Sequence, residues 1–151
     1  MEEDSAVAKI HIRKLKKGDA TAIKRINSAI TKMPSVLDFR RIVTEKAQKK
    51  TDASFVAVVD GNVVGYMIGY ITLGNFGVDQ CGWITMLGVD PKFMGQGIGV
   101  SLAKKIFAFY KDKGVSNVFT SMRWDFTDLL SFFKKLGFDR SDFINLRKIL
   151  D

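Results

Sequence analysis

Three glycines fall within five residues, between a predicted strand and a predicted helix. The turn Gly95-Gln96-Gly97-Ile98-Gly99 follows the apolar residues 82–89 and precedes residues 100–113, whose apolar side chains recur at helical spacing. Such a turn is typical of folds that combine helices with a sheet. Glycines there admit positive φ and close approach of a ligand, and the N–H groups at a helix start are unpaired. We expect an anion to bind here; the alternative is that the glycines only turn the chain.

Two familiar nucleotide-binding loops do not fit this turn. A P-loop requires Lys and then Ser or Thr after its last glycine, whereas Gly99 is followed by Val100 and Ser101. A dinucleotide fingerprint requires glycine at position 100 and an acidic residue roughly 20 residues later, and Asp125 lies too far along. The turn therefore predicts an anion-binding site that is neither a P-loop nor a dinucleotide-binding loop.

The rest of the chain predicts an order of strand, helix, helix, three strands, helix, strand, helix and strand. The turn Asp60-Gly61-Asn62 between two apolar runs is a strong hairpin signal, because it favours positive φ. The expected elements are a strand near 10–15, a helix at 19–32, a helix opening at Ser35, strands at 55–59, 63–73 and 82–89, a helix at 100–113, a strand at 115–122, a helix at 127–136 and a strand at 143–150.

Composition narrows the class of protein. With 151 residues, 46% of them hydrophobic, the chain can bury one core, so we expect a single domain over residues 1–151. No apolar run approaches the roughly 18–20 residues of a membrane span, and residues 1–7 lack the features of a signal peptide. One cysteine, Cys81, permits neither an internal disulfide nor a cysteine zinc cluster, and we expect no metal. A cytoplasmic protein is expected.

The net charge of +8 is concentrated at the start of the chain. Residues 1–50 hold 13 Lys or Arg against 6 Asp or Glu, whereas residues 51–151 hold 11 against 10. Such a surface attracts nucleic acid, an anionic cofactor or an acidic substrate. The alternative is a solvated helical surface whose lysines serve solubility.

Three stretches carry a recognisable pattern: residues 83–91 (WITMLGVDP), 93–102 (FMGQGIGVSL) and 129–138 (LLSFFKKLGF). In that order they resemble the fourth strand, the pyrophosphate loop with the third helix, and the terminal helix of the GNAT superfamily of N-acetyltransferases. The element order agrees over nearly the whole chain. The resemblance implies an α/β (α+β) fold with a central mixed, mostly antiparallel sheet of about six strands, splayed between strands four and five, and about four helices.

The resemblance further implies acetyl-CoA as cosubstrate, bound by the glycine turn and the strand before it. The family pattern is Arg or Gln, two residues, Gly, one residue, then Gly or Ala. It places Gly97 and Gly99 on its glycines and Met94 where Arg or Gln is usual. Main-chain N–H groups would hold the phosphates, and pantetheine would lie in the splay. The expected cofactor-binding residues are Leu87, Val89, Met94, Gly95, Gln96, Gly97, Ile98, Gly99, Val100 and Phe133.

The reaction implied is direct attack of a primary amine on the thioester in a ternary complex. The N–H of Leu87 would face the thioester carbonyl and stabilise the oxyanion, and a comparable donor is typically worth about 3–4 kcal/mol. Phe133 stands where family members often carry a tyrosine that protonates the leaving thiolate. A phenyl ring cannot donate a proton, so the thiolate leaves unaided or another group assists.

The base is open at this stage. Trp83 and Thr85 stand near the place where a strand-four glutamate is common, and neither can act as a base. Asp125 and Asp128 are the nearest carboxylates in sequence to the expected acceptor site, and a water chain is the alternative. Both aspartates also have structural uses, as a helix cap and as a favourable charge in a helix's first turn.

Other residues carry weaker expectations. His11 is expected to lie exposed in the first strand, and Cys81 to be an inert thiol. Tyr66, Tyr70 and Trp124 are candidates for lining an acceptor pocket, although strand aromatics usually belong to the core.

Three functions follow, in descending order of preference. The first is acetyl transfer from acetyl-CoA to a small-molecule, peptide or protein amine, with the protein a monomer or a homodimer. The second is a CoA-binding module with little catalytic activity. The third is a basic protein that associates with nucleic acid or the ribosome, although we do not expect nucleic acid as the partner.

Overall fold

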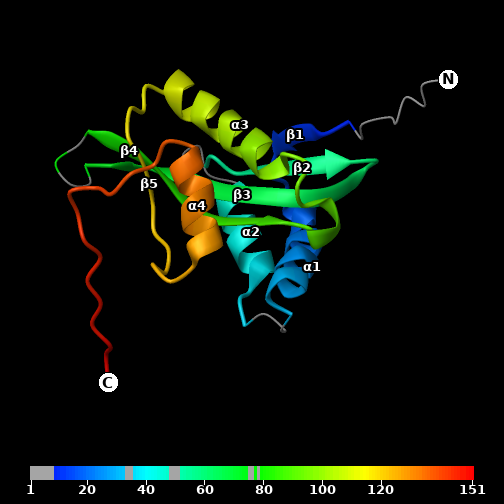
Figure 1. Ribbon diagram of the computed structural model, residues 1–151, viewed down its shortest axis with the longest axis horizontal. Coiled ribbons are helices and arrows are strands. Elements are labelled where there is room, and N and C mark those ends of the chain that lie inside the picture. Colours follow the sequence, from blue (N-terminus) through cyan, green and yellow to red (C-terminus); the bar gives the residue numbers. More distant parts are fainter. Residues whose placement is uncertain (1–8, 33–35, 48–51, 75–76, 78) are drawn as a thin grey trace. The chain divides into compact units, whose positions relative to one another are not determined.

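The computed structural model describes residues 9–32, 36–47, 52–74, 77 and 79–151 (Figure 1). The chain divides into one compact unit that ends at Ser121 and a second that runs from Met122 to Asp151. Each unit is described by itself. The expectation of one domain over residues 1–151 stays a prediction.

The order of elements follows the predicted one up to the last helix. The elements are β1 (His11–Lys14), the short turn η1 (Lys17–Asp19), α1 (Ala20–Thr31), α2 (Phe39–Ala47), β2 (Phe55–Val59), β3 (Asn62–Leu73), β4 (Gln80–Val89), the short turn η3 (Pro91–Phe93), α3 (Ile98–Asp112), β5 (Val118–Thr120) and α4 (Thr127–Lys135). Of the helices in these described ranges, none has the length and apolarity that crossing a bilayer requires.

The sheet follows the chain, in the order β1-β2-β3-β4-β5. The first three pairings are antiparallel, and β4 pairs with β5 in parallel. The turn at Asp60 and Gly61 joins β2 to β3 with positive φ at both residues, 50° and 78°, as the hairpin signal predicts. The mixed, mostly antiparallel sheet is confirmed.

The predicted sixth strand is wrong. Residues 143–150 form no strand, and the sheet of the described residues has five strands. The large apolar side chains there are exposed, for example Leu146 at 84% and Leu150 at 81%. A stretch rich in apolar residues satisfies only a local requirement for a strand, which also needs the hydrogen bonds of a neighbouring strand.

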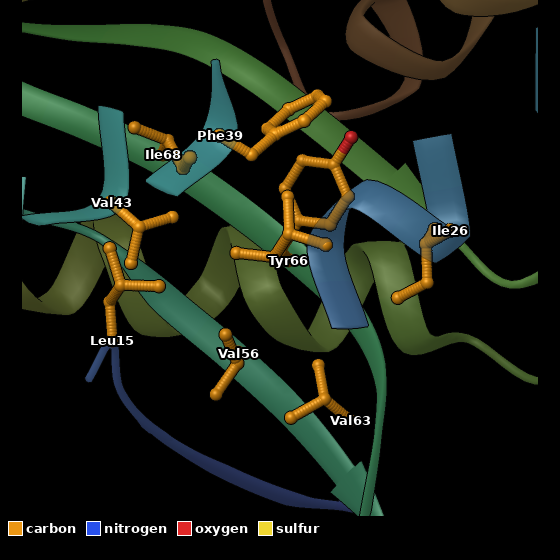
Figure 2. Packing of buried hydrophobic residues seen from close by; sticks show 9 residues of the cluster. Leu15, Ile26, Phe39, Val43, Val56, Val63, Tyr66 and Ile68 are labelled. Carbon is orange, nitrogen blue, oxygen red and sulfur yellow. The ribbon is translucent and has the colours of Figure 1, made fainter. Parts of the chain in front are cut away.

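One face of the sheet packs against α1 and α2. Buried apolar side chains of these helices and of strands β2 and β3 converge there, as Figure 2 shows for Val56, Tyr66 and Ile68 among others. Fully burying a side chain of this size stabilises the fold by about 1.5–3 kcal/mol. The cluster consists of Leu15, Ile23, Ile26, Phe39, Val43, Val56, Val63, Tyr66 and Ile68.

An ion pair of Asp19, and not a side-chain cap, lies at the start of α1. Asp19 accepts no hydrogen bond as a side-chain cap of α1. Its carboxylate instead accepts hydrogen bonds from both terminal nitrogens of Arg13, each at 2.9 Å, and from the N–H of Lys16 at 2.7 Å. Asp19 is 5% exposed, so this bidentate bond satisfies a buried charge and ties β1 to α1.

The other face of the sheet receives α3 on strand positions that have no side chain. A Cβ on Gly65 would lie 2.9 Å from Ile98, and one on Gly82 would lie 2.8 Å from the ring of Tyr110. The Tyr110 hydroxyl donates to the carbonyl oxygens of Trp83 and Tyr70. Burial raises the pKa of Tyr110, so the hydroxyl stays protonated as a donor. Figure 1 shows α3 on the side of the sheet opposite α1 and α2.

Replacing Gly82 tests this close packing. Gly82→Ala should lower the free energy of unfolding by about 1–3 kcal/mol, because the new methyl group overlaps the Tyr110 ring. Gly18→Ala is the matched control, since nothing lies within 4 Å of its added Cβ, and it should leave stability unchanged or raise it by up to about 1 kcal/mol. Urea unfolding measures both. Equal midpoints for the two variants would refute the packing argument.

Candidate functional site

Strand β4 loses its neighbour on one side halfway along its length. It pairs with β5 only at Gly82, Trp83 and Ile84, whereas β4 itself continues to Val89. The side chain of Thr120 donates to the Ile84 carbonyl at 2.9 Å, at the last residue pair of the two strands. Beyond it, one edge of β4 has no strand beside it among the described residues of this unit. The expected divergence of strands four and five is confirmed.

The hydrogen bonds that β4 makes to β3 on its other edge show which main-chain groups point to this free edge. The N–H of Asp90, directly after β4, bonds to the Val64 carbonyl of β3 at 2.8 Å. Peptide groups alternate along a strand, so Gly88 also faces β3, whereas Leu87 and Val89 direct their N–H and C=O groups to the free edge. These are the two strand residues that the sequence predicts for the cofactor.

The glycine turn follows the same strand. Gly95 and Gly97 have φ of 81° and 77°, values that favour glycine. Gly97 is the N-cap of α3, which starts at Ile98, two residues earlier than predicted. The first hydrogen bond at this end runs from the Ser101 N–H to the Gly97 carbonyl at 3.0 Å. The N–H groups of residues 98–100 therefore have no intrahelical acceptor, and the helix dipole adds positive potential there.

Space above the turn is open. An added Cβ on Gly95 or Gly97 would have nothing within 4 Å. Ile98 is 1% exposed and anchors the helix start against β3, whereas Met94 is 55% exposed and Val100 39%. The turn thus presents main-chain N–H donors and small residues to solvent, and the buried Ile98 holds it in position. This arrangement suits a phosphate group.

The candidate bases belong to the second unit. Asp125 forms an exposed bidentate pair with Arg123, at 3.1 Å to Nε and 2.9 Å to Nη2. The hydrogen bond from Arg123 lowers the pKa of Asp125. Asp128 is exposed in the first turn of α4. Phe133 is buried and packs edge-on against Phe132 and Phe138, with centroids 5.3 and 5.0 Å apart.

The structure thus brings together Leu87, Val89 and the glycine turn, which are continuous in the first unit. Asp125, Asp128 and Phe133 belong to the second unit. The roles of all these residues remain predictions.

The weaker candidates divide between core and surface. Tyr66 is 1% exposed, its hydroxyl bonds to the Asn27 side chain and burial raises its pKa, so it belongs to the core and not to a pocket lining. Tyr70 lies beneath the ammonium of Lys46, 4.2 Å from the ring centroid. Trp124 is 88% exposed. His11 is exposed in β1, as expected.

Two residues that shape the strand end were missed by sequence reasoning. The main chain of Asp90 fixes the alternation of β4, and its carboxylate accepts the Lys92 N–H at 3.0 Å. Gly88 lets Tyr66 pack flat on β4, because a Cβ there would lie 2.8 Å from its ring. A glycine inside a strand was the available signal for this close approach.

The sequence was compared with protein families and with curated proteins. Residues 22–138 match the family described as Acetyltransferase (GNAT) family. The chain belongs to the GNAT acetyltransferase family. A mycothiol acetyltransferase of Amycolatopsis mediterranei is 29% identical over 94 residues, covering 60% of this chain and 31% of that protein. One from Arthrobacter sp. is 30% identical over 92 residues, covering 60% and 28%. The chain spans less than a third of the length of these relatives.

Solved structures share the GNAT fold of this chain. An aminoglycoside acetyltransferase from an uncultured soil metagenomic sample, in complex with sisomicin, superposes with a TM-score of 0.76 at 23% identity over 94% of this chain and 97% of that one. An aminoglycoside N-acetyltransferase in complex with CoA gives 0.79 at 18% identity over 94% and 95%. At these identities the likeness shows the fold.

Amide hydrogen exchange tests the free edge of this GNAT chain. The N–H groups of Leu87 and Val89 should exchange at least about 10-fold faster than those of Gly88 and Asp90, because only the latter pair bonds to β3. Residue-resolved NMR exchange measures the four rates in one sample. Equal protection of all four amides would show that the free edge is closed.

Proposed function

We propose that this chain transfers the acetyl group of acetyl-CoA to a primary amine. The observation that carries the proposal is the placement of the free-edge amides of Leu87 and Val89 on the strand that leads into the glycine turn. One end of an elongated ligand can bond along β4 while its phosphates reach the start of α3. CoA has this form, with a peptide-like pantetheine arm joined to a pyrophosphate.

The residues present fit the phosphates of CoA. Open space over Gly95 and Gly97 admits phosphate oxygens, and the unpaired N–H groups of residues 98–100 supply donors. Met94, with a long exposed side chain, supplies no N–H donor where family members carry Arg or Gln. The main chain therefore carries most of the proposed phosphate binding.

The proposed reaction is a direct acyl transfer. The amine nitrogen forms a bond to the thioester carbon, the carbon–sulfur bond breaks with its electron pair on sulfur, a base takes a proton from the nitrogen, and CoA leaves as a thiolate that solvent protonates. The N–H of Leu87 points from the free edge and is the proposed donor to the developing oxyanion. Phe133 supplies no proton, and a free thiol has a pKa of only about 8.5, so the thiolate can leave without a protein acid.

Either Asp125 or Asp128 is proposed as the base that takes the amine proton. Asp125 is the weaker choice, because its pair with Arg123 lowers its pKa and a general base works best with a pKa near the working pH. Asp128 has no ion-pair partner among the described residues, so we favour it. A water chain between main-chain carbonyls of β4 is the remaining candidate.

The other functions are less well supported. A nucleic-acid partner would explain neither the free edge nor the glycine turn. The family match also favours acetyl transfer over both alternatives.

Ligand-induced stabilisation tests cosubstrate binding. Acetyl-CoA at about 100 times its dissociation constant should add about 2.7 kcal/mol to the free energy of unfolding, a rise in melting temperature of roughly 5–10 °C. Gly97→Val should abolish the rise, since φ of 77° strains any β-branched residue and the side chain fills the turn. Gly18→Val is the control away from the turn. A full rise in Gly97→Val that is folded would exclude this site.

Turnover tests the base. With release of free CoA as the readout and a panel of amines that includes sisomicin and lysine peptides, Asp128→Asn should lower kcat at least about 100-fold and remove the low-pH limb of the rate profile. Asp125→Asn should have a smaller effect. If both variants retain wild-type turnover and pH dependence, neither aspartate is the base, and the water chain is favoured.

A further inference from the structure

A second polar pocket lies where the start of α1 meets the start of α2. Its volume is about 420 Å³, and the residues that line it include Lys17, Thr21, Lys24, Asp38 and Arg40. Phe39, which is 2% exposed, anchors this end of α2 in the core. None of the residues of the glycine turn or of the free edge of β4 takes part in it.

The three cations are brought together by helix geometry. Thr21 and Lys24 are three residues apart in α1 and therefore share one face of it, and Lys17 lies in the short turn η1 that runs directly into α1. Arg40 approaches from the first turn of α2. Like charges repel, so cations that served only solubility would be more stable apart, whereas these three line one pocket.

Nearby carboxylates leave this charge largely unbalanced. Asp38 lies in the lining and caps α2 by accepting the Arg41 N–H at 3.1 Å. Asp19 is occupied by Arg13 and 5% exposed. Among the described residues, ion pairs join Arg13 to Asp19 and Arg123 to Asp125, so within that part of the chain no carboxylate pairs with a cation of this pocket. Three cations against one carboxylate leave an excess of two positive charges.

We propose that this pocket binds the phosphate group of a small phosphorylated molecule. A phosphomonoester carries about −1.5 to −2 charges near pH 7, which matches the excess in the lining. Arg40 can offer two parallel N–H donors to phosphate oxygens, the lysines add point charges, and the Thr21 hydroxyl can donate. The proposal concerns binding at α1 and α2 and does not depend on acetyl transfer.

Phosphate titration followed by NMR tests the pocket on the wild-type protein. Inorganic phosphate and phosphoserine should both shift the amide signals of residues 17–24 and 37–41 in a saturable way, with phosphoserine as the probe for an organic phosphate source. Succinate, a dicarboxylate, should bind at least about 10-fold more weakly. Saturable shifts confined to residues 95–101, or equal affinity for succinate, would overturn the proposal.

Paired variants separate this pocket from the glycine turn, which is also suited to anions. Lys24→Gln combined with Arg40→Gln should weaken phosphate binding at least about 10-fold, because hydrogen bonds from two charged donors are lost. Lys104→Gln with Lys111→Gln, an equal charge change at exposed positions of α3, should leave it unchanged. Gly97→Val should also leave it unchanged, whereas it should abolish acetyl-CoA binding. Phosphate affinity that falls in Gly97→Val and persists in the Lys24 and Arg40 double variant would refute the proposal.

Discussion

The close contact of α3 with β3 and β4 determines where the candidate cofactor site forms. Gly65 and Gly82 present bare main chain to Ile98 and Tyr110, so the helix lies nearer the sheet than side chains would allow. Tyr110 then bonds to strand carbonyls from within the core. Because Ile98 is the first residue of α3, the same contact holds the glycine turn beside the end of β4.

Local sequence signals predicted much of this arrangement. The turn at Asp60 and Gly61 and the glycines at 95–99 impose backbone geometry on their own residues, so neither depends on distant partners. The strand glycines were harder to interpret. A glycine in a strand weakens it when considered alone, and only the ring of Tyr110, nearly 30 residues from Gly82, explains its presence.

What the sequence did not predict depends on contacts that a local residue pattern does not specify. Residues 143–150 are rich in apolar side chains, but this composition does not identify a neighbouring strand to pair with. The pairing of Asp125 with Arg123 changes its strength as a base, although the sequence suggested a helix cap. Likewise, the basic pocket requires Arg40 to lie beside Lys24, and a charge count of residues 1–50 cannot specify that proximity.

The donors on the free edge of β4 belong to peptide groups and not to side chains. Substitution of Leu87 or Val89 changes what packs around the strand, yet the N–H groups stay in place as long as the strand keeps its path. Most side chains of such a strand can therefore change while its main-chain donors stay in place. A solved structure shares the fold of this chain with a TM-score of 0.76 at 23% identity, so the fold is kept although fewer than a quarter of the aligned residues are the same.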